Sequence, residues 1–385
     1  MISDADPDLA VPPDSDVAQT AREEAAAPRP SGAPGPPMLL NIQVLRGLAA
    51  LLVVFVHLQD LAQLGGARPD IFLWGNTGVD LFFVISGLIM VQTTSRRPTG
   101  PLGFLRNRLV RVAPLYWLVT LAVFVLAMVA PGLLQHTDAD PLLLLKSLLF
   151  VPYARADGTF RPIVFLGWTL NYEMAFYVLF ALGLTLPSRI LRRGLPIVFL
   201  AAVVAAGAIF RPADALAQFY TAPIVLEFAG GMILGAGLLR WVEDRRKGQV
   251  ALAAAAIALA AMLCGPSLAP NVDRAVIAGI PAMIIVGGCL IAERAGFVLR
   301  LPFLQTVGNA SYSIYLTHFF VTSLVTKLAA RFHLDAPAPL AAAMLAALVL
   351  VIAVGIATHV WIELPLTRFF RQGFTGAPLR SSVKA

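Results

Sequence analysis

Long apolar blocks alternate with short polar segments along most of this chain. A helix needs about 20 apolar residues to cross the hydrocarbon core of a bilayer, and about ten blocks reach or approach that length. The predicted spans are 39–59, 71–92, 112–131, 165–187, 195–210, 221–240, 249–267, 274–292, 302–326 and 338–361. The block 195–210 is the shortest. A further segment, 142–151, is too short to span, and we expect it at the membrane interface.

The composition agrees with this pattern. Of 385 residues, 58% are hydrophobic and 13% are charged, and the mean hydropathy is +0.78. A soluble globular domain carries about 25% charged residues. We therefore predict an all-α polytopic membrane protein whose surroundings are the lipid bilayer. The net charge of +7 does not indicate a nucleic-acid partner, because the excess of basic residues lies in the loops between spans.

Three regions are predicted along the chain. Residues 1–37 are acidic and rich in proline, so we expect them to form a disordered tail. Of its two possible roles, we favour a dispensable extension over a partner-binding segment. No cleavable signal peptide is predicted, because no short basic segment precedes the first apolar block. The membrane domain is expected at 38–371, and residues 372–385 are expected to form a C-terminal tail.

Basic residues in short loops predict the orientation. If the N-terminus is cytoplasmic, the loops on the inner side hold about twice as many Lys and Arg residues as the outer loops. That bias favours ten spans with both termini in the cytoplasm. The pattern depends on the span count, because one missed span would exchange the two sides for the rest of the chain.

The first apolar block contains two ionisable residues, Arg46 and His57. On a helix they are about 16 Å apart along the axis and return to nearly the same face. Ionisable side chains are costly inside a bilayer, by about 2.5–3.5 kcal/mol on insertion scales, so each is a functional hypothesis by default. The predicted topology places Arg46 toward the cytoplasm and His57 toward the outside.

Other spans carry ionisable residues at a similar predicted depth. We expect a cluster in the outer half of the bundle formed by His57, Asp80, Glu173, Glu227 and His318. A histidine beside a carboxylate is suited to general-base catalysis near neutral pH. The alternative for each residue is a hydrogen bond between helices, which accounts for Asp80, Glu227 and His318 equally well.

Arginines gather just before the third predicted span, at Arg106, Arg108 and Arg111. Guanidinium groups suit phosphate oxygens, so these residues are candidates to bind a phosphate-bearing donor at the cytoplasmic face. Two alternative roles stay open for them. Any cytoplasmic loop gathers arginines as a topology signal, and arginines also bind anionic lipid headgroups.

Six segments in order resemble one family. They are Arg46 with His57 in the first span, and GVDLFFVISGL at 78–88, RLVRVAPLYW at 108–117, WTLNYEM at 168–174, SYSIYLTH at 311–318 and ELPLTR at 363–368. This chain resembles the acyltransferase-3 family of integral membrane O-acyltransferases over roughly residues 39–371. The sequence Asn171-Tyr172-Glu173 is most similar to the branch that acylates exopolysaccharides. Many members have two adjacent acids there, whereas this chain has one.

The resemblance implies a reaction and roles. Acetyl-CoA in the cytoplasm would be the donor and co-substrate, with no permanently bound cofactor and no metal. The acceptor would be a sugar hydroxyl of a surface polysaccharide or lipid-linked glycan, and the location would be the bacterial cytoplasmic membrane. His57, Glu173 and Arg46 are expected to form the catalytic set. His57 would be general base or acyl carrier, Glu173 would orient or charge the imidazole, and Arg46 would steer the donor. The coenzyme phosphates are assigned to Arg106, Arg108 and Arg111, and acceptor binding to Asp80, Tyr172 and His318.

A transporter of a lipid-linked glycan or an anion is the rival function. Intramembrane charges also mark ion pathways. The sequence shows neither a repeat of the inverted kind nor a matched pair of interrupted spans, which many transporters have. An assay of acetyl-CoA consumption separates the two classes.

Overall fold

The computed structural model describes residues 39–96, 98–130, 132, 139–155, 158–237, 244–269 and 271–375. The predicted tail 1–37 lies outside these residues, and so does 376–385 of the predicted C-terminal tail. The C-terminal boundary expected at 371 falls within a helix that continues to Thr375.

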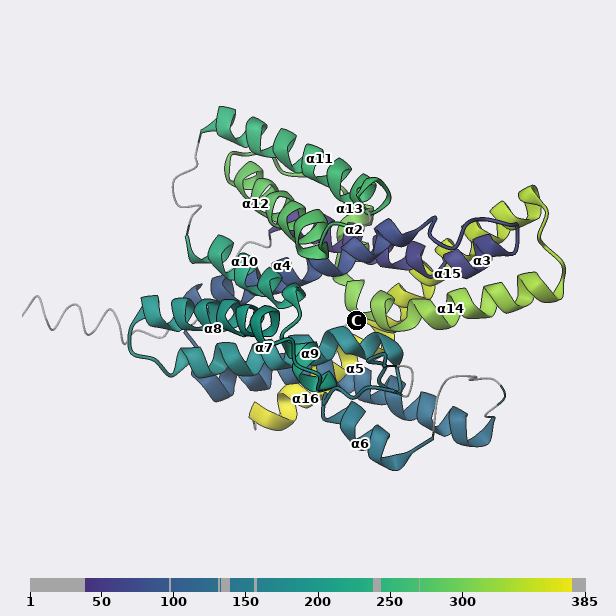
Figure 1. Ribbon diagram of the computed structural model, residues 1–385, viewed down its shortest axis with the longest axis horizontal. Coiled ribbons are helices and arrows are strands. Elements are labelled where there is room, and N and C mark those ends of the chain that lie inside the picture. Colours follow the sequence, from purple (N-terminus) through teal and green to yellow (C-terminus); the bar gives the residue numbers. More distant parts are fainter. Residues whose placement is uncertain are drawn as a thin grey trace, which may run out of the picture. The chain divides into compact units, whose positions relative to one another are not determined.

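Within the described residues every regular element is a helix, apart from one isolated bridge between Ala154 and Phe160 (Figure 1). The α-helices are α2 (Leu40–Val56), α3 (Gln59–Gln63), α4 (Thr77–Arg96), α5 (Pro101–Val129), α6 (Pro141–Leu148), α7 (Trp168–Leu184), α8 (Arg189–Phe210), α9 (Ala215–Tyr220), α10 (Leu226–Ala236), α11 (Arg245–Leu268), α12 (Ile280–Arg294), α13 (Pro302–Asn309), α14 (Ser311–Arg331), α15 (Pro337–Thr358) and α16 (Leu364–Thr375). Single-turn 3₁₀ or π segments are η1 (Leu73–Asn76), η3 (Phe165–Gly167), η4 (Pro223–Val225), η5 (Ala275–Gly279) and η6 (His359–Glu363).

Nine helical stretches of the described chain are long and apolar enough to cross a membrane. They correspond to nine of the ten predicted blocks. The remaining block, 302–326, is not one continuous helix, because the chain leaves helical geometry at Ala310 between α13 and α14. Asn309, which accepts a hydrogen bond from Gln43 of α2, ends α13. The second piece, α14, has 21 residues, but its many hydroxyl groups make it less apolar than the other spans.

Polar residues act as N-caps of several helices, at the positions where the apolar segments begin. Asp140 accepts a hydrogen bond from the Leu142 amide at 2.7 Å, and Pro141 follows as the first residue of α6. Ser188 accepts from the Leu191 amide at 3.1 Å and caps α8 in the same way. Such caps satisfy amides that have no partner within the helix. The short α6 corresponds to the predicted non-spanning segment 142–151.

Helix α4 lies at the centre of the bundle and packs against α2, α7, α10 and α12. It crosses α10 at Gly87 and Gly231. A Cβ atom on Gly87 would lie 2.2 Å from the Phe228 carbonyl oxygen, and one on Gly231 would lie 2.0 Å from that of Val84. The two backbones are therefore in direct contact, which is the usual consequence of small residues at a membrane helix crossing.

The first turn of α2 is fixed by polar contacts to a segment distant in sequence. Glu293, at the end of α12, accepts hydrogen bonds from the amides of Leu40 at 2.7 Å and Asn41 at 3.0 Å. The Asn41 side chain, which is fully buried, donates to the carbonyls of Cys289 and Phe297. These contacts fix the rotation of α2 and therefore the direction in which Arg46 points.

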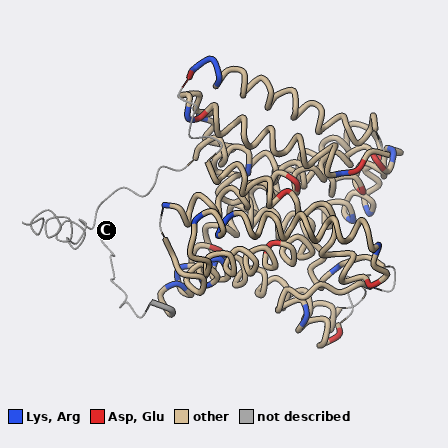
Figure 2. Tube along the Cα trace, turned by 60° about the vertical axis from the view of Figure 1, so that its left-hand side comes forward, with Lys and Arg blue, Asp and Glu red and all other residues tan. Residues whose placement is uncertain are grey.

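The outer helices expose apolar residues. Helices α8 and α11 are the least buried of the described spans, and α15 also presents large apolar side chains outward. Ile209 is 73% exposed and Ile257 is 72% exposed. Figure 2 shows most charged residues near the two ends of the helices and a few within the apolar middle. Apolar surface of this extent indicates contact with lipid.

Candidate active site

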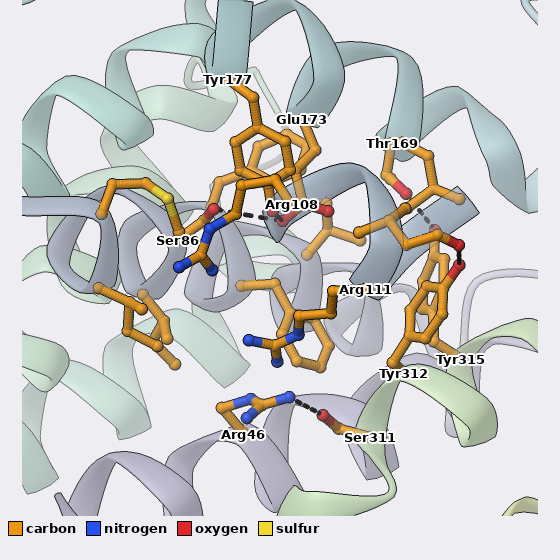
Figure 3. Close-up of a pocket in the computed structure, with 18 residues that line it drawn as sticks. Arg46, Ser86, Arg108, Arg111, Thr169, Glu173, Tyr177, Ser311, Tyr312 and Tyr315 are labelled. Carbon is orange, nitrogen blue, oxygen red and sulfur yellow. Dashed lines mark hydrogen bonds between the residues drawn. The ribbon is translucent and has the colours of Figure 1, made fainter. Parts of the chain in front are cut away.

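A cavity opens between α2, α4, α5, α7 and α14 (Figure 3). It encloses about 790 Å³ of space, part of which is open to the surroundings. Its polar lining residues are Arg46, Ser86, Arg108, Arg111, Thr169, Glu173, Tyr177, Ser311, Tyr312 and Tyr315. Three guanidinium groups and one carboxylate thus face a single space inside an otherwise apolar bundle.

Arg46 is held at the cavity wall by two hydrogen bonds. It donates to Ser311 Oγ of α14 at 2.8 Å and to Gln43 Oε1, one turn earlier on α2, at 2.9 Å. Figure 3 shows its guanidinium group on the same side of the cavity as Ser311. Both partners are neutral. These hydrogen bonds therefore hold the guanidinium group in place without neutralising its positive charge.

Arg108 and Arg111 come from α5. The sequence pattern starts the third span at 112, but α5 begins at Pro101, so the arginines belong to the helix itself and not to a loop. Positions three apart share a helix face, whereas positions two apart do not. Arg108 and Arg111 accordingly line the cavity, and Arg106 does not. Arg108 stacks on Phe104, with 5.6 Å from Cζ to the ring centroid, and its buried Nε has no hydrogen-bond partner among the residues that the structure describes.

Glu173, on α7, lines the same cavity as these arginines. Its carboxylate accepts hydrogen bonds from Ser86 Oγ of α4 at 3.3 Å and from the Tyr177 hydroxyl. Among the described residues no ion pair joins Glu173 to an arginine of the cavity. With three cations and one anion, the cavity carries an excess of positive charge that favours an anionic ligand.

His57 lies beyond the end of the cavity, at the C-terminal end of α2. Its ring contacts those of Phe165 (centroids 5.4 Å apart), Phe319 (5.5 Å) and His318 (4.9 Å). His318 is fully buried; its Nδ1 lies 3.1 Å from the Ile314 carbonyl, and its Nε2 has no partner within the described chain. The structure therefore forms a histidine pair from α2 and α14.

Arg46 and His57 share one side of α2, as predicted, because both contact α14. Arg46 reaches Ser311 and His57 reaches His318, two turns further along the same helix. No hydrogen bond joins Glu173 to His57 among the described residues, so the role of Glu173 in orienting His57 stays a prediction. Glu173 uses Ser86 and Tyr177 instead.

Tyr315 lies against both the cavity and His318 of the histidine pair. Its side chain lines the cavity, and its ring centroid is 5.9 Å from that of His318. The hydroxyl lies 2.8 Å from Thr169 Oγ1 and donates to the Leu166 carbonyl at 3.0 Å. Tyr315 thus connects the cavity lining to His318 of the histidine pair.

Asp80 and Tyr172 lie outside the cavity lining. Asp80, on α4, is fully buried and receives two hydrogen bonds from Arg274, at 2.7 Å and 3.1 Å. Glu227 of α10 is only 3% exposed, and both its oxygens lack partners among the described residues. The Tyr172 hydroxyl donates to the Phe219 carbonyl at 2.7 Å, and the two rings stack 3.9 Å apart.

The five ionisable residues expected to gather in the outer half of the bundle have different neighbours in the structure. Three groups exist: the cavity with Glu173, the histidine pair, and the group formed by Asp80, Glu227 and Arg274. Helix rotation is the reason, because Asp80 and Ser86 of α4 are about 120° apart and face different neighbours. Similar depth in the membrane does not imply the same helix face.

Sequence reasoning missed several residues that the cavity gathers, namely Ser86, Tyr177, Ser311, Tyr312 and Tyr315. Four of them lie inside the motif segments at 78–88 and 311–318, so a signal was present. A hydroxyl within an apolar run carries little information alone, because it can bond to its own helix. Arg274 was missed because its place in the sequence is that of a loop arginine.

Comparisons with known proteins identify the family of this chain. The chain matches the family described as an acyltransferase domain, acyltransferase family 3, over residues 39–359. Exopolysaccharide production protein ExoZ of Rhizobium meliloti (strain 1021) is 39% identical over 315 residues, which cover 77% of this chain and 91% of that protein. Acyltransferase MdmB of Streptomyces mycarofaciens is 28% identical over 319 residues, covering 74% and 80%. No solved structure matches the chain.

The family match spans most of the chain and includes every residue that lines the arginine cavity and both members of the histidine pair. The relative with 39% identity is covered almost over its full length. This chain therefore belongs to acyltransferase family 3 and is an acyltransferase.

Proposed function

We propose that this protein moves an acetyl group from cytoplasmic acetyl-CoA to a sugar hydroxyl of a surface polysaccharide or a lipid-linked glycan. The observation that carries the proposal is the positively charged cavity inside a bundle of membrane-spanning helices, in a chain of an acyltransferase family. The name of the relative ExoZ, an exopolysaccharide production protein, supports a polysaccharide-related acceptor.

The donor would enter from the end of the bundle where α5 begins, which the distribution of basic loop residues assigns to the cytoplasm. Arg108 and Arg111 would bind the diphosphate through charge-assisted hydrogen bonds. Arg46 would guide the pantetheine arm onward. Glu173 accepts hydrogen bonds and faces the same space, so it is suited to receive an amide N–H of that arm.

His57 would activate the acceptor. In the direct route, its imidazole takes the proton of the sugar hydroxyl while the oxygen attacks the thioester carbonyl, and the proton then passes to the leaving coenzyme A thiolate. In the carrier route, an imidazole nitrogen attacks the thioester carbonyl, and the ring N–H proton passes to the leaving coenzyme A thiolate. The sugar oxygen then attacks the acetylimidazole, and the proton of its hydroxyl restores the neutral imidazole. Both routes form one ester and one thiol. His318 adjoins the imidazole and is positioned to contact the acceptor or His57.

Radiolabelled acetyl transfer in proteoliposomes tests the proposal. Wild-type protein should move label from acetyl-CoA to polysaccharide or lipid-linked glycan, and His57→Ala should reduce turnover by about 10⁴-fold, as loss of one member of a catalytic unit commonly does. His333→Ala is the matched control, because His333 is exposed just beyond the end of α14 and its removal should retain full activity. Near-normal turnover in folded His57→Ala protein contradicts the assignment.

The same preparation separates the enzyme from the rival transporter. By either route an acyltransferase sustains turnover of acetyl-CoA only when an acceptor is present, and in the steady state it yields one thiol per ester formed. A transporter of glycan or anion moves its cargo with no release of coenzyme A. Transport without thiol release would overturn the proposed reaction.

A further inference from the structure

A second cavity lies at the end of the bundle where α4 and α7 end and α8 begins. It comprises about 610 Å³ of space, part of which is open to the surroundings. Its lining residues are Thr94, Ser95, Pro98, Thr99, Phe180, Leu184, Arg189, Arg192 and Arg193. None of the residues proposed above to bind or react with substrate takes part in it. It is a separate space with its own charged residues.

Its described lining carries three guanidinium groups and three hydroxyl groups, and no carboxylate. Two of the arginines are held in place: Arg193 donates to Ser95 Oγ at 2.8 Å, and Arg192 donates to the Leu186 carbonyl at 2.6 Å. Arg189 is exposed and makes no hydrogen bond or ion pair with another described residue. Guanidinium and hydroxyl donors around an acid-free space are the chemistry of a phosphate site.

The second cavity follows the arginine cavity along the same two helices, α4 and α7. On α4, Met90 lines the arginine cavity and Thr94 lines the second one, a single turn or about 6 Å further along. On α7, Tyr177 lines the arginine cavity, and Phe180, three residues further along, lines the second cavity. Phe104 of α5 packs on both, with ring centroids 6.1 Å from Tyr177 and 5.1 Å from Phe180. One aromatic layer therefore separates the two positively charged spaces.

We propose that the second cavity binds the phosphate on the ribose of the donor, at the nucleotide end of coenzyme A. This inference rests on the proposed function. Coenzyme A carries two anionic parts, a diphosphate and a ribose monophosphate, with the ribose between them. Two positive cavities one helical turn apart fit this division, with the diphosphate at Arg108 and Arg111 and the monophosphate at Arg189, Arg192 and Arg193.

A topology signal alone does not account for this arrangement. The positive-inside bias requires basic residues on one side of the membrane, but it does not require them to converge on one cavity without an acid. A lipid headgroup offers the same phosphate chemistry as the coenzyme. The test must therefore distinguish a phosphate that belongs to the donor from one that belongs to the bilayer.

The experiment compares acetyl-CoA with acetyl-dephospho-CoA, which lacks only the ribose monophosphate, in proteoliposomes. For wild-type protein we expect the KM for acetyl-CoA to be lower than that for acetyl-dephospho-CoA by about tenfold or more. Acetyl-dephospho-CoA lacks the ribose monophosphate and therefore loses its charge-assisted contacts. Arg189→Gln and Arg192→Gln should each raise the KM for acetyl-CoA and leave that for acetyl-dephospho-CoA nearly unchanged. Arg246→Gln is the control, since Arg246 is exposed on α11 outside both cavities.

Three results overturn the inference. Full preference for acetyl-CoA in both Arg189→Gln and Arg192→Gln contradicts it. An equal rise of KM for both donors, reversed by adding anionic lipid, assigns the cavity to a lipid headgroup. If wild-type protein transfers acetyl from neither donor while folded, the proposed function fails, and this inference fails with it. Arg189→Gln removes no hydrogen bond of the described chain, so a folding defect does not obscure the result.

Discussion

Two sets of buried charges in this protein are arranged in opposite ways. In the arginine cavity, Arg46, Arg108 and Arg111 face a shared space, and their described hydrogen-bond partners are neutral. In the second set, Arg274 forms a two-point ion pair with the buried carboxylate of Asp80. Both sets lie between α4 and neighbouring helices, so depth and residue type do not account for the difference.

The difference separates structural charges from charges that await a ligand. An ion pair whose members bond to each other satisfies its own hydrogen-bonding needs and joins two helices. Unpaired cations around a cavity are costly in a membrane, and that cost is offset when an anion binds. We therefore expect substitutions in the ion pair to alter stability first, and substitutions in the cavity to alter substrate binding first.

The largest effect on stability is expected for Arg274→Gln. This change leaves the fully buried Asp80 carboxylate unpaired beside Glu227, and loss of one partner of a buried pair costs about 3 kcal/mol or more. We expect the loss of stability to be close to the lower limit of this range, because the Arg274 side chain is 43% exposed. Asp80→Asn should cost less, since Arg274 can then turn toward solvent or lipid headgroups.

Unfolding temperature in detergent, followed by tryptophan fluorescence, measures both variants. Asp80→Asn combined with Arg274→Gln should be more stable than Arg274→Gln alone, because no buried carboxylate is then left without its cation at that position. If Arg274→Gln is as stable as wild type but has lost donor binding, the ion pair belongs to the substrate site and the distinction between the two sets is wrong.

A smaller effect, on binding, is expected for Arg111→Gln. Arg111 lines the cavity and bonds to no other described side chain, so its removal leaves no carboxylate without a partner. The KM for acetyl-CoA should rise about tenfold, the value of one charge-assisted contact, with a smaller change in kcat. The unfolding temperature of the donor-free protein should stay close to that of wild type.

Titration of the purified protein with coenzyme A, read as thermal stabilisation, provides an independent measurement. Binding raises stability in proportion to RT ln(1 + [L]/Kd), so Arg111→Gln should need about tenfold more coenzyme A for the same shift. A fall in kcat at unchanged KM would instead place Arg111 at the reacting atoms.

The smallest effect is expected for Tyr177→Phe. The substitution removes one of the two described hydrogen bonds to Glu173 and leaves the one from Ser86. Loss of a single hydrogen bond to a charged group should reduce kcat/KM by about tenfold or less. Tyr220→Phe is the matched control, because Tyr220 lies outside the cavity lining. An unchanged kcat/KM in Tyr177→Phe would indicate that the orientation of Glu173 does not matter for the reaction.

Several parts of the site could be predicted residue by residue. The relation of Arg46 to His57 follows from helix geometry alone, and the structure confirms it through their shared contact with α14. The separation of Arg106 from Arg108 and Arg111 also follows from helix periodicity, once α5 is known to begin at Pro101. That start could not be read from hydropathy, because the first turns of α5 are too polar to belong to an apolar block.

The sequence by itself determined the all-helical class, nine of the ten apolar spans and the candidate family, because these depend on local composition, periodicity and short motifs. Only the tertiary structure decided which charges meet. It divided the five expected residues into three groups, paired Asp80 with Arg274, and placed Tyr315 against both the arginine cavity and His318. The physical reason is that contacts between helices depend on how each helix is rotated about its axis. That rotation is set by distant contacts such as Glu293 with the first turn of α2 and Gly87 with α10.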